Sequence, residues 1–515
     1  MTAWSNGYVA GIPYTHGYFR RMKPAHIRLT GLMRGHAVPN TERVAYAELG
    51  CGQGFGTTLI AAANPDADVY GFDFNPEQIH NARQLSARAG LQNVTFSEMS
   101  LEELAELPRA DLPDFDIVAL HGVYSWISPE ARAAIGVFLR RKLKPGGLVY
   151  ISYNAMPGCA ALQPLQRLVR AEGARMGGTS DARARAGVTF AAELAEKGFG
   201  FLKESPAVAR RLEHNKNHSG TYLAHEYLNA DWTVFYLEDV VRELDAAKLV
   251  FLGSARLLDN DLRLSVPTEL QEFFEAIDDP IRRETLKDYW CNRTFRVDVF
   301  QKGRMSLSRS EVLSGVRTQR VGLRKAAKSV DLAFSIGSGP MVGHREYFDP
   351  LLDRLGRGSA TIAELEEALR GKADLIMLMR MIVVLDASDQ LEVTRLTPAD
   401  PEPSRRLNRV LAEDWTGPYR FVAAPEFGGA LEASSDDLLL LNCILHGTEP
   451  TADALAEAVA AHLVGSGGTR EVDTTVLRKR ATRFVDDVLP VWRMAGVVAG
   501  EGGREAALPR IVAVS

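Results

Sequence analysis

A glycine-rich loop between a short strand and a helix constrains the fold of this chain more than any other feature. Residues 43–49 (RVAYAEL) are typical of a buried strand, the loop GCGQGFG follows at 50–56, and a helix is predicted over 57–63. Its four glycines allow the backbone to approach a ligand closely at the start of the helix. The spacing does not fit the dinucleotide pattern G-x-G-x-x-G, because Phe55 or Thr57 stands where a third glycine would be. The loop therefore favours a ligand other than a pyrophosphate.

Strands and helices alternate beyond this loop. Asn75 and Pro76 form a strong helix start, and the helix should end at Gly90. Further strands are expected at 66–74, 93–99, 115–121 and 148–154. This alternation indicates parallel βαβ units, so we predict an α/β, Rossmann-like sheet. Ligands bind beyond the carboxyl ends of such strands. The residues expected at those ends are Glu48, Gly50, Asp73, Glu98, Met99 and His121.

A helical insertion interrupts the sheet pattern. Residues rich in Ala, Arg and Glu follow the fifth strand, after which a helix at 237–249 and strands at 250–256 and 292–301 resume the pattern. We therefore expect an N-terminal lid segment at 1–40, a core at 41–160, a helical cap at 161–229 and a closing, regulatory-type region at 230–305.

The C-terminal part of the chain has a different pattern. Three helices and a strand within 347–394, the second helix opening on a Thr361–Glu364 capping box, resemble a winged-helix module. The Pro-rich segment 396–404 is a candidate linker. We predict a winged-helix-like domain at 306–396 and a mainly helical domain at 405–515.

The charge balance argues against nucleic acid as a partner. Lysine and arginine number 60 against 65 acidic residues, a net charge of −5, whereas sequence-independent binding needs a basic face. The acidic helix at 363–369 (AELEEAL) would also repel phosphates. We expect the winged-helix-like region to bind protein or to form a homodimer.

Cysteine usage and hydropathy predict a cytoplasmic protein without membrane insertion. The four cysteines form no C-x-x-C pair, and the chain start lacks a secretory pattern. The most apolar helix, 375–385, is too short for a membrane span and contains Arg380. A metal site is not expected, since His214 and His218 have no evident third ligand.

The acids around the loop suggest what it binds. Glu48 would repel a phosphate but would accept an ammonium or a ribose hydroxyl. Asp73 lies about 20 residues beyond Gly52, where a carboxylate can accept hydrogen bonds from ribose hydroxyls. Glu98 and Met99 could flank an adenine. A ligand with ribose, adenine and an ammonium group but no phosphate is S-adenosylmethionine, and NAD is the competing interpretation.

These residues also carry a family resemblance. The pattern E-x-G-x-G-x-G at 48–54, the acid Asp73 and LKPGG at 143–147 resemble class I S-adenosylmethionine-dependent methyltransferases. The resemblance implies S-adenosyl-L-methionine as cofactor and S-adenosyl-L-homocysteine as product.

A narrower resemblance extends over about residues 8–305. Segments HGVYSW (121–126), SYNAMPG (152–158) and YLAHEYLN (222–229) resemble bacterial methyltransferases with a regulatory domain, including rickettsial protein-lysine methyltransferases. The N-terminal segment departs from the family form, because it continues into Arg20 and Arg21 rather than ending in Pro.

The site residues follow from these patterns. The cofactor-binding candidates are Glu48, Gly50, Cys51, Gly52, Gly54, Asp73, Phe74, Glu98, Met99, Ser100 and His121. The catalytic candidates, expected to line the acceptor pocket, are His121, Tyr124 and Trp126. The substrate-binding candidates are the lid residues Tyr14, Tyr18 and Phe19, then Asn154 and, on one helix face, Tyr222, His225 and Glu226. Tyr124 and Trp126 could instead pack beneath the cap, and the last three could satisfy buried contacts there. His121 is a candidate proton acceptor.

Three functions remain open from the sequence. The resemblance favours N-methylation of lysine side chains in a protein or peptide by in-line transfer. A small-molecule or natural-product methyltransferase is the alternative, with the C-terminal region used for dimerisation or carrier docking. The third is a non-catalytic module that only binds S-adenosylmethionine.

Overall fold

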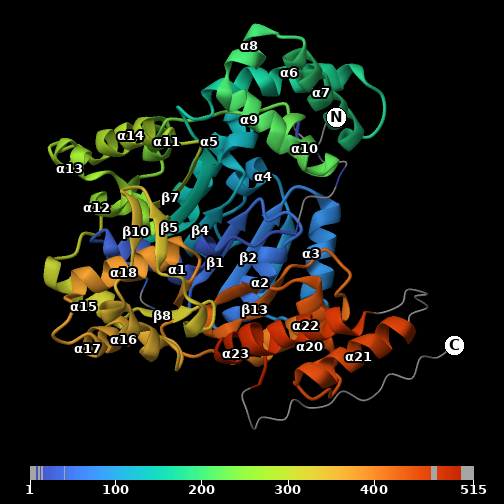
Figure 1. Cartoon of the computed structure of the whole chain (residues 1–515). Helices are drawn as coiled ribbons and strands as arrows, with labels where there is room; N and C mark the ends of the chain where they lie inside the picture. Colours follow the sequence, from blue (N-terminus) through green and yellow to red (C-terminus); the bar gives the residue numbers. More distant parts are fainter. Residues whose placement is uncertain (1–6, 10–11, 13–15, 40, 466–472, 500–515) are drawn as a thin grey trace.

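A seven-stranded, mainly parallel sheet forms the centre of the molecule (Figure 1). The computed structural model describes residues 7–9, 12, 16–39, 41–465 and 473–499. The strand order is β3-β2-β1-β4-β5-β7-β6, and β7 runs antiparallel to both of its neighbours. The strands are β1 (Ala45–Leu49), β2 (Asp68–Asp73), β3 (Val94–Glu98), β4 (Phe115–Leu120), β5 (Leu143–Asn154), β6 (Leu249–Ser254) and β7 (Phe295–Lys302). The predicted Rossmann-like sheet is thus confirmed.

Helices cover both faces of the sheet. Successive side chains of a strand point to opposite faces, so Tyr46 and Ala47 of β1 join two different apolar cores. One core includes α1, α2 and α3, and the other includes α4, α5 and α11. Their bounds are α1 (Pro24–Met33), α2 (Phe55–Ala63), α3 (Pro76–Arg88), α4 (Leu101–Glu106), α5 (Pro129–Lys142) and α11 (Leu237–Asp245). Asn75 caps α3 as predicted, accepting a hydrogen bond from the Glu77 amide at 3.0 Å.

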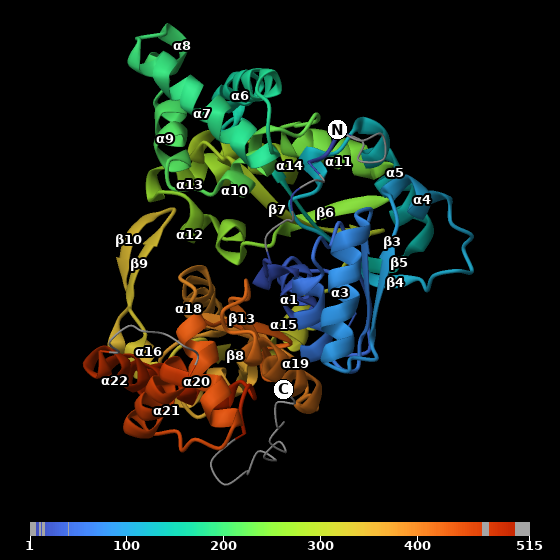
Figure 2. The same ribbon diagram turned by 90° about the vertical axis from the view of Figure 1, so that its right-hand side faces the viewer.

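The insertion after β5 forms a helical unit at the end of the sheet (Figures 1 and 2). Its helices are α6 (Gln163–Arg175), α7 (Ser180–Glu196), α8 (Gly200–Glu204), α9 (Pro206–Asn215) and α10 (Gly220–Tyr227). They share an apolar core of their own, which Val9 from the N-terminal segment joins. The chain then returns to the sheet through α11 and β6, and reaches β7 through α12 (Leu262–Ser265), α13 (Thr268–Glu275) and α14 (Pro280–Cys291).

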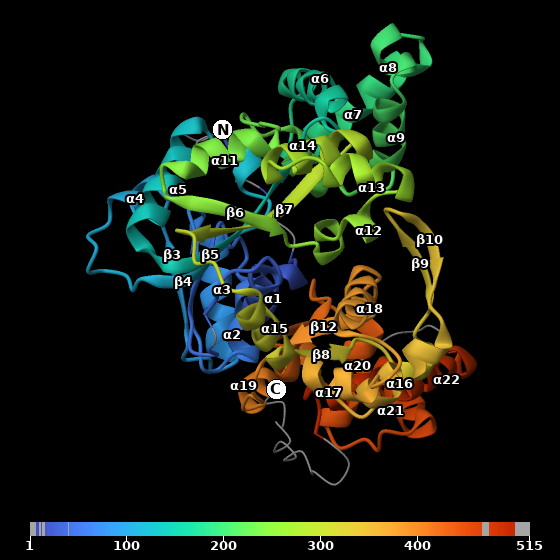
Figure 3. The same cartoon turned by 90° about the vertical axis from the view of Figure 1, so that its left-hand side faces the viewer.

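Residues 309–394 form a second unit around a small antiparallel sheet of order β11-β8-β12. Its elements are α15 (Arg309–Thr318), β8 (Arg320–Leu323), β9 (Ala333–Ile336), β10 (Gly339–Val342), α16 (Arg345–Leu355), β11 (Ala360–Thr361), α17 (Ile362–Ala368), α18 (Leu375–Ala387) and β12 (Leu391–Thr394). Thr361 and Glu364 form the expected capping box. The sequence did not predict the β9–β10 hairpin, which projects toward α12 (Figure 3), where the Ser338 amide donates to Leu264 O at 3.0 Å. The winged-helix assignment itself stays a prediction.

The C-terminal elements of the chain pack against α2, the helix that follows the glycine loop. The elements of this region are α19 (Glu402–Glu413), β13 (Phe421–Ala424), β14 (Gly429–Glu432), α20 (Ser435–Leu445), α21 (Ala452–Gly465), α22 (Thr474–Arg483) and α23 (Leu489–Met494). Helix α19 takes the end of the expected linker and lies on α2, where the Ser404 hydroxyl donates to Ala62 O at 2.9 Å. Helix α2, which follows the glycine loop, is therefore buried between the sheet and the C-terminal region.

Buried ion pairs attach the N-terminal segment to the C-terminal region. Arg20 pairs with Asp386 at the end of α18, and Lys23 pairs with Glu392 of β12. All four side chains are at most 8% exposed. The described part of the lid segment is thus fixed by residues more than 360 positions away. No helix of the described residues is both long and apolar enough to cross a bilayer.

Candidate active site

The glycine loop is a backbone cradle between β1, β2 and the segment after β4. The amides of Gly50 and Cys51 donate to Phe72 O at 2.8 and 3.0 Å. Gly50, Gly52 and Gly54 all have positive φ, between 55° and 73°. A Cβ on Gly50 would lie 2.5 Å from a Val123 methyl group. Only glycine fits here, for reasons of both conformation and space.

Glu48 is the penultimate residue of β1, just before this loop. Its carboxylate is buried and accepts a hydrogen bond from the Thr57 hydroxyl at 2.6 Å. Burial raises the pKa of Glu48 to about 7, against the opposing effect of the Thr57 hydrogen bond. Glu48 faces a cavity of about 50 Å³ that Cys51 and the loop glycines also line.

Asp73 stands at the end of β2 and organises the same loop. Its two carboxylate oxygens accept hydrogen bonds from the Gly52 amide at 2.9 Å and the Asn75 amide at 3.0 Å. Burial raises the pKa of Asp73, although these amides oppose the shift. Asp73 lines a second cavity, of about 130 Å³, together with Phe74, Met99 and Ser100.

His121 follows β4 and borders both cavities. Its Nδ1 lies 2.9 Å from the Tyr150 hydroxyl, and its ring stacks on Phe19 with centroids 3.5 Å apart. Burial, followed by the charges of Arg21 and Arg256, lowers the pKa of His121 to about 3. The imidazole is therefore neutral at physiological pH.

An aromatic wall continues from His121 along the larger cavity. Trp126 lines that cavity and stacks on Trp232, with ring centroids 5.8 Å apart. The Trp232 indole donates to Asn154 Oδ1 at 3.3 Å, so Asn154 orients this wall rather than lining the cavity. Tyr8, which the sequence reasoning missed, also lines the cavity. Its place in an aromatic-rich lid segment was the available signal.

The cap reaches the site through Tyr8. The His225 ring lies 5.7 Å from the Tyr8 ring, which in turn lies 6.0 Å from Phe74. Glu226 instead pairs with Arg211 at 3.4 Å, and Tyr222 stacks on His218. Of the three predicted cap residues, His225 is the one next to the site.

Three more predicted site residues, Gly54, Glu98 and Tyr124, line neither of these cavities. Tyr124 is 1% exposed in the apolar core, and its hydroxyl donates to Glu243 of α11. Its predicted place in the acceptor pocket was wrong, because the turn after β4 directs the ring into the core that α5 and α11 cover. Glu98 is exposed at the end of β3, although it shares a strand face with the buried Phe96, and it lines neither cavity. Tyr14 lies outside the described residues.

The two cavities suit S-adenosylmethionine. Asp73 lines the larger cavity and Glu48 the smaller one, and Gly50 and Gly52 of the glycine loop line both. No lysine or arginine lines either cavity within the described chain, as a diphosphate would require. The described residues also contain no group of three His, Cys, Asp or Glu side chains able to hold a metal ion.

Comparison with known proteins agrees with this geometry. A model described as a methyltransferase domain matches residues 40–190, and one described as a predicted methyltransferase regulatory domain matches 219–302. An uncharacterised protein of Synechocystis is 36% identical over 370 residues, 72% of each chain. One of Rickettsia prowazekii is 25% identical over 58% of this chain and 53% of its own length.

Solved structures share the whole fold. PKMT2 from Rickettsia typhi superposes with a TM-score of 0.70, at 18% identity, over 95% of this chain and all of that one, and its complex with AdoHcy superposes with a TM-score of 0.69. Fold and site define a class I S-adenosylmethionine-dependent methyltransferase, whose cofactor is S-adenosylmethionine. The chain belongs to the family of these enzymes that carry a methyltransferase regulatory domain.

Proposed function

We propose that this methyltransferase N-methylates a lysine side chain of a protein or peptide. The observation that carries the proposal is the aromatic wall of Phe19, His121 and Trp126 beside the cofactor cavities. Apolar, aromatic surroundings desolvate a lysine amine and lower its pKa, which favours the neutral nucleophile. The motif resemblance to rickettsial protein-lysine methyltransferases, and the large C-terminal region, support a macromolecular acceptor.

The chain's residues would hold both reactants in line. Glu48 would bind the ammonium of S-adenosylmethionine, Asp73 its ribose, and Phe74 and Met99 would flank its adenine. When bound, the cofactor supplies a methyl group whose carbon bonds to the acceptor nitrogen as the carbon–sulfur bond breaks, which leaves S-adenosylhomocysteine. Phe19 and Trp126 would exclude water from the acceptor and align its nitrogen.

His121 would orient the acceptor rather than deprotonate it. Its pKa of about 3 lies far below the ordinary pKa of a lysine ammonium, near 10.4. Proton transfer to this imidazole is therefore strongly unfavourable. The lysine would lose its proton on leaving water, and His121, held by Tyr150, would offer a fixed hydrogen-bonding edge.

Labelled S-adenosylmethionine and host lysate test the proposal. We expect label on protein, and mass spectrometry should locate it on lysine. The matched control is the Asp73→Ala variant, which should transfer none. Label confined to small molecules would favour a small-molecule methyltransferase, and cofactor binding without any transfer would favour a non-catalytic module. Homodimer formation stays a separate prediction.

A further inference from the structure

A third cavity shares Phe19 and His121 with the glycine-loop cavity. Its volume is about 320 Å³, and it lies where the N-terminal segment, the sheet and the C-terminal region meet. Aromatic side chains, including Phe295 and Phe421, form part of its wall. Its charged lining residues are Arg20, Arg21, Arg256, Arg324, Asp389 and Glu432.

Two of the four arginines are already neutralised. Arg20 pairs with Asp386 and, through Nε, with Asp389 at 2.9 Å. Arg324 pairs with the buried Glu392. These pairs hold the wall together, and they leave these two guanidinium groups little charge to offer a ligand.

Arg21 and Arg256 have no such partner. No carboxylate in the described part of the chain lies within 4.0 Å of either guanidinium. Both side chains are partly buried, and the Arg21 Nε is buried without a hydrogen-bond partner. The remaining lining carboxylate, Glu432, is exposed and makes no ion pair among the described residues.

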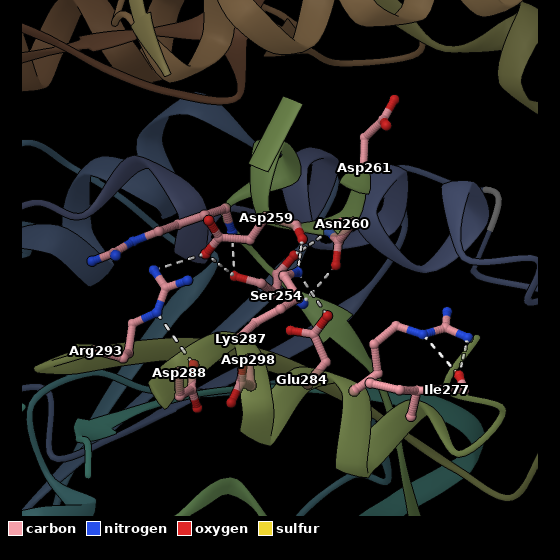
Figure 4. A network of polar contacts seen from close by, with 12 residues as sticks. Ser254, Asp259, Asn260, Asp261, Ile277, Glu284, Lys287, Asp288, Arg293 and Asp298 are labelled. Atoms are coloured by element: carbon pink, nitrogen blue, oxygen red, sulfur yellow. Dashed lines mark hydrogen bonds and ion pairs between the residues drawn. The ribbon is translucent and has the colours of Figure 1, made fainter. Parts of the chain in front are cut away.

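The ion pairs of Asp259 and Arg293, shown in Figure 4, explain why Arg256 has no carboxylate partner. Asp259, the acid closest to it along the chain, pairs with Arg293 at 3.2 Å. Arg293 also contacts Asp288 at 3.3 Å, so it is held in place from two sides. Burial lowers the pKa of Arg256, and the attraction of Asp259 opposes the shift only in part.

We propose that Arg21 and Arg256 bind an oxyanion, a carboxylate or a phosphate, carried by the methyl acceptor. This inference rests on the proposed function, because it concerns the acceptor of the same site. Phe19 and His121 line both this cavity and the glycine-loop cavity, so a group bound here lies beside the place of methyl transfer. An unpaired, partly buried guanidinium is costly, and guanidinium groups bind carboxylates and phosphates through paired hydrogen bonds.

The positive charge of the cavity also determines from which side the lysine amine of the acceptor approaches His121. The two unpaired cations Arg21 and Arg256 outweigh the one unpaired carboxylate, Glu432, so a lysine ammonium would be repelled and the amine would approach His121 from outside this cavity. An acidic side chain near that lysine would enter the cavity instead. The enzyme would therefore prefer lysines with a neighbouring negative charge.

Peptide pools test this preference on the wild-type enzyme. Pools with a central lysine and one Glu, phosphoserine or Gln at each flanking position are methylated with labelled S-adenosylmethionine. Hydrogen bonds to charged groups correspond to about a tenfold to hundredfold effect, so we expect KM to be lower by that factor for Glu or phosphoserine pools than for Gln pools. Equal KM values for all three pools would overturn the inference.

Variants of the two arginines test whether the preference for acidic peptides arises in this cavity. Arg21→Gln and Arg256→Gln should abolish the difference between pools while the affinity for S-adenosylhomocysteine stays unchanged. The matched control is Arg282→Gln, on the exposed surface of α14. An undiminished preference in both variants would contradict the assignment.

A further experiment tests whether the oxyanion belongs to a peptide or to a small-molecule acceptor. Citrate, offered as a small acceptor, should remain unlabelled. Methyl transfer to citrate that is lost in Arg21→Gln would retain the oxyanion site but overturn the lysine acceptor. Failure to bind S-adenosylhomocysteine would contradict the proposed function independently of this site.

Discussion

The cofactor cavities and the arginine cavity meet at His121, but they are built in different ways. The cofactor cavities use residues at the ends of consecutive strands, and their charged groups, such as Glu48 and Asp73, are acidic. The arginine cavity combines the N-terminal segment, the sheet and the C-terminal region. The cofactor cavities follow from a sheet topology that many enzymes share. The arginine cavity depends on how segments that are far apart in this sequence pack together. Cofactor binding and acceptor choice should therefore respond to different mutations.

The largest effect is expected where the C-terminal region holds the lid. Asp386→Ala would leave Arg20 with only the exposed Asp389 as an ion-pair partner, and breaking a buried pair costs about 3 kcal/mol. The free energy of unfolding, measured by urea titration, should fall by about that amount. Methylation should fall with it, because Phe19 precedes Arg20.

The control for this variant touches the same guanidinium. Asp389 contacts Arg20 but is 70% exposed, so Asp389→Asn, which tolerates the left-handed backbone at this position (φ 56°), should cost about 0.5 kcal/mol. Equal effects for the two variants would mean that burial does not decide the strength of this attachment.

Cofactor affinity should depend next on Asp73. Asp73→Ala removes the proposed ribose acceptor and the partner of the Gly52 amide. Loss of two charge-assisted hydrogen bonds should weaken S-adenosylhomocysteine binding about a hundredfold or more, measured by calorimetry. Asp68→Ala, at the exposed start of the same strand, should bind normally. If both variants bound equally well, the cofactor would not be held at the end of β2.

The pH dependence of binding tests Glu48. Its pKa of about 7 lies above the ordinary value because of burial, so the carboxylate is mostly protonated at pH 6 and mostly ionised at pH 8. Only the ionised form attracts an ammonium, and affinity should rise by up to about tenfold per pH unit as pH increases toward 7. Glu48→Gln should flatten this profile. A wild-type affinity independent of pH between 6 and 7.5 would contradict the role.

The same titration affects stability with the opposite sign. A pKa raised in the folded state means that the folded protein binds the proton more tightly than the unfolded chain. The contribution of Glu48 to the stability of the unliganded protein should therefore be lost as pH rises through about 7.

The sequence predicted the cofactor site better than the acceptor side, for a physical reason. Glu48, Asp73 and the loop glycines lie at or just after the carboxyl ends of β1 and β2, and the parallel direction of these strands brings those ends to one edge of the sheet. The exposure of Glu98 did not follow from the sequence, because Glu98 shares a strand face with Phe96, which is buried against Gly54 and Gly71. Arg256 could not be identified, because its proximity to Arg21 depends on packing between segments more than 200 positions apart.

The smallest effect on activity is expected at Tyr124, the catalytic candidate that the structure moves into the core. Its hydroxyl donates to Glu243, and Arg132 lies 6.0 Å from its ring centroid, on the side of the sheet covered by α5 and α11. Tyr124→Phe keeps the ring and removes one hydrogen bond, which should cost about 1 kcal/mol of stability. Because the hydroxyl does not line the cofactor cavities, kcat and KM should stay within about twofold of wild type once folding is accounted for. A loss of kcat without a loss of stability would return Tyr124 to the acceptor side, and would mean that the turn after β4 rearranges when the acceptor binds.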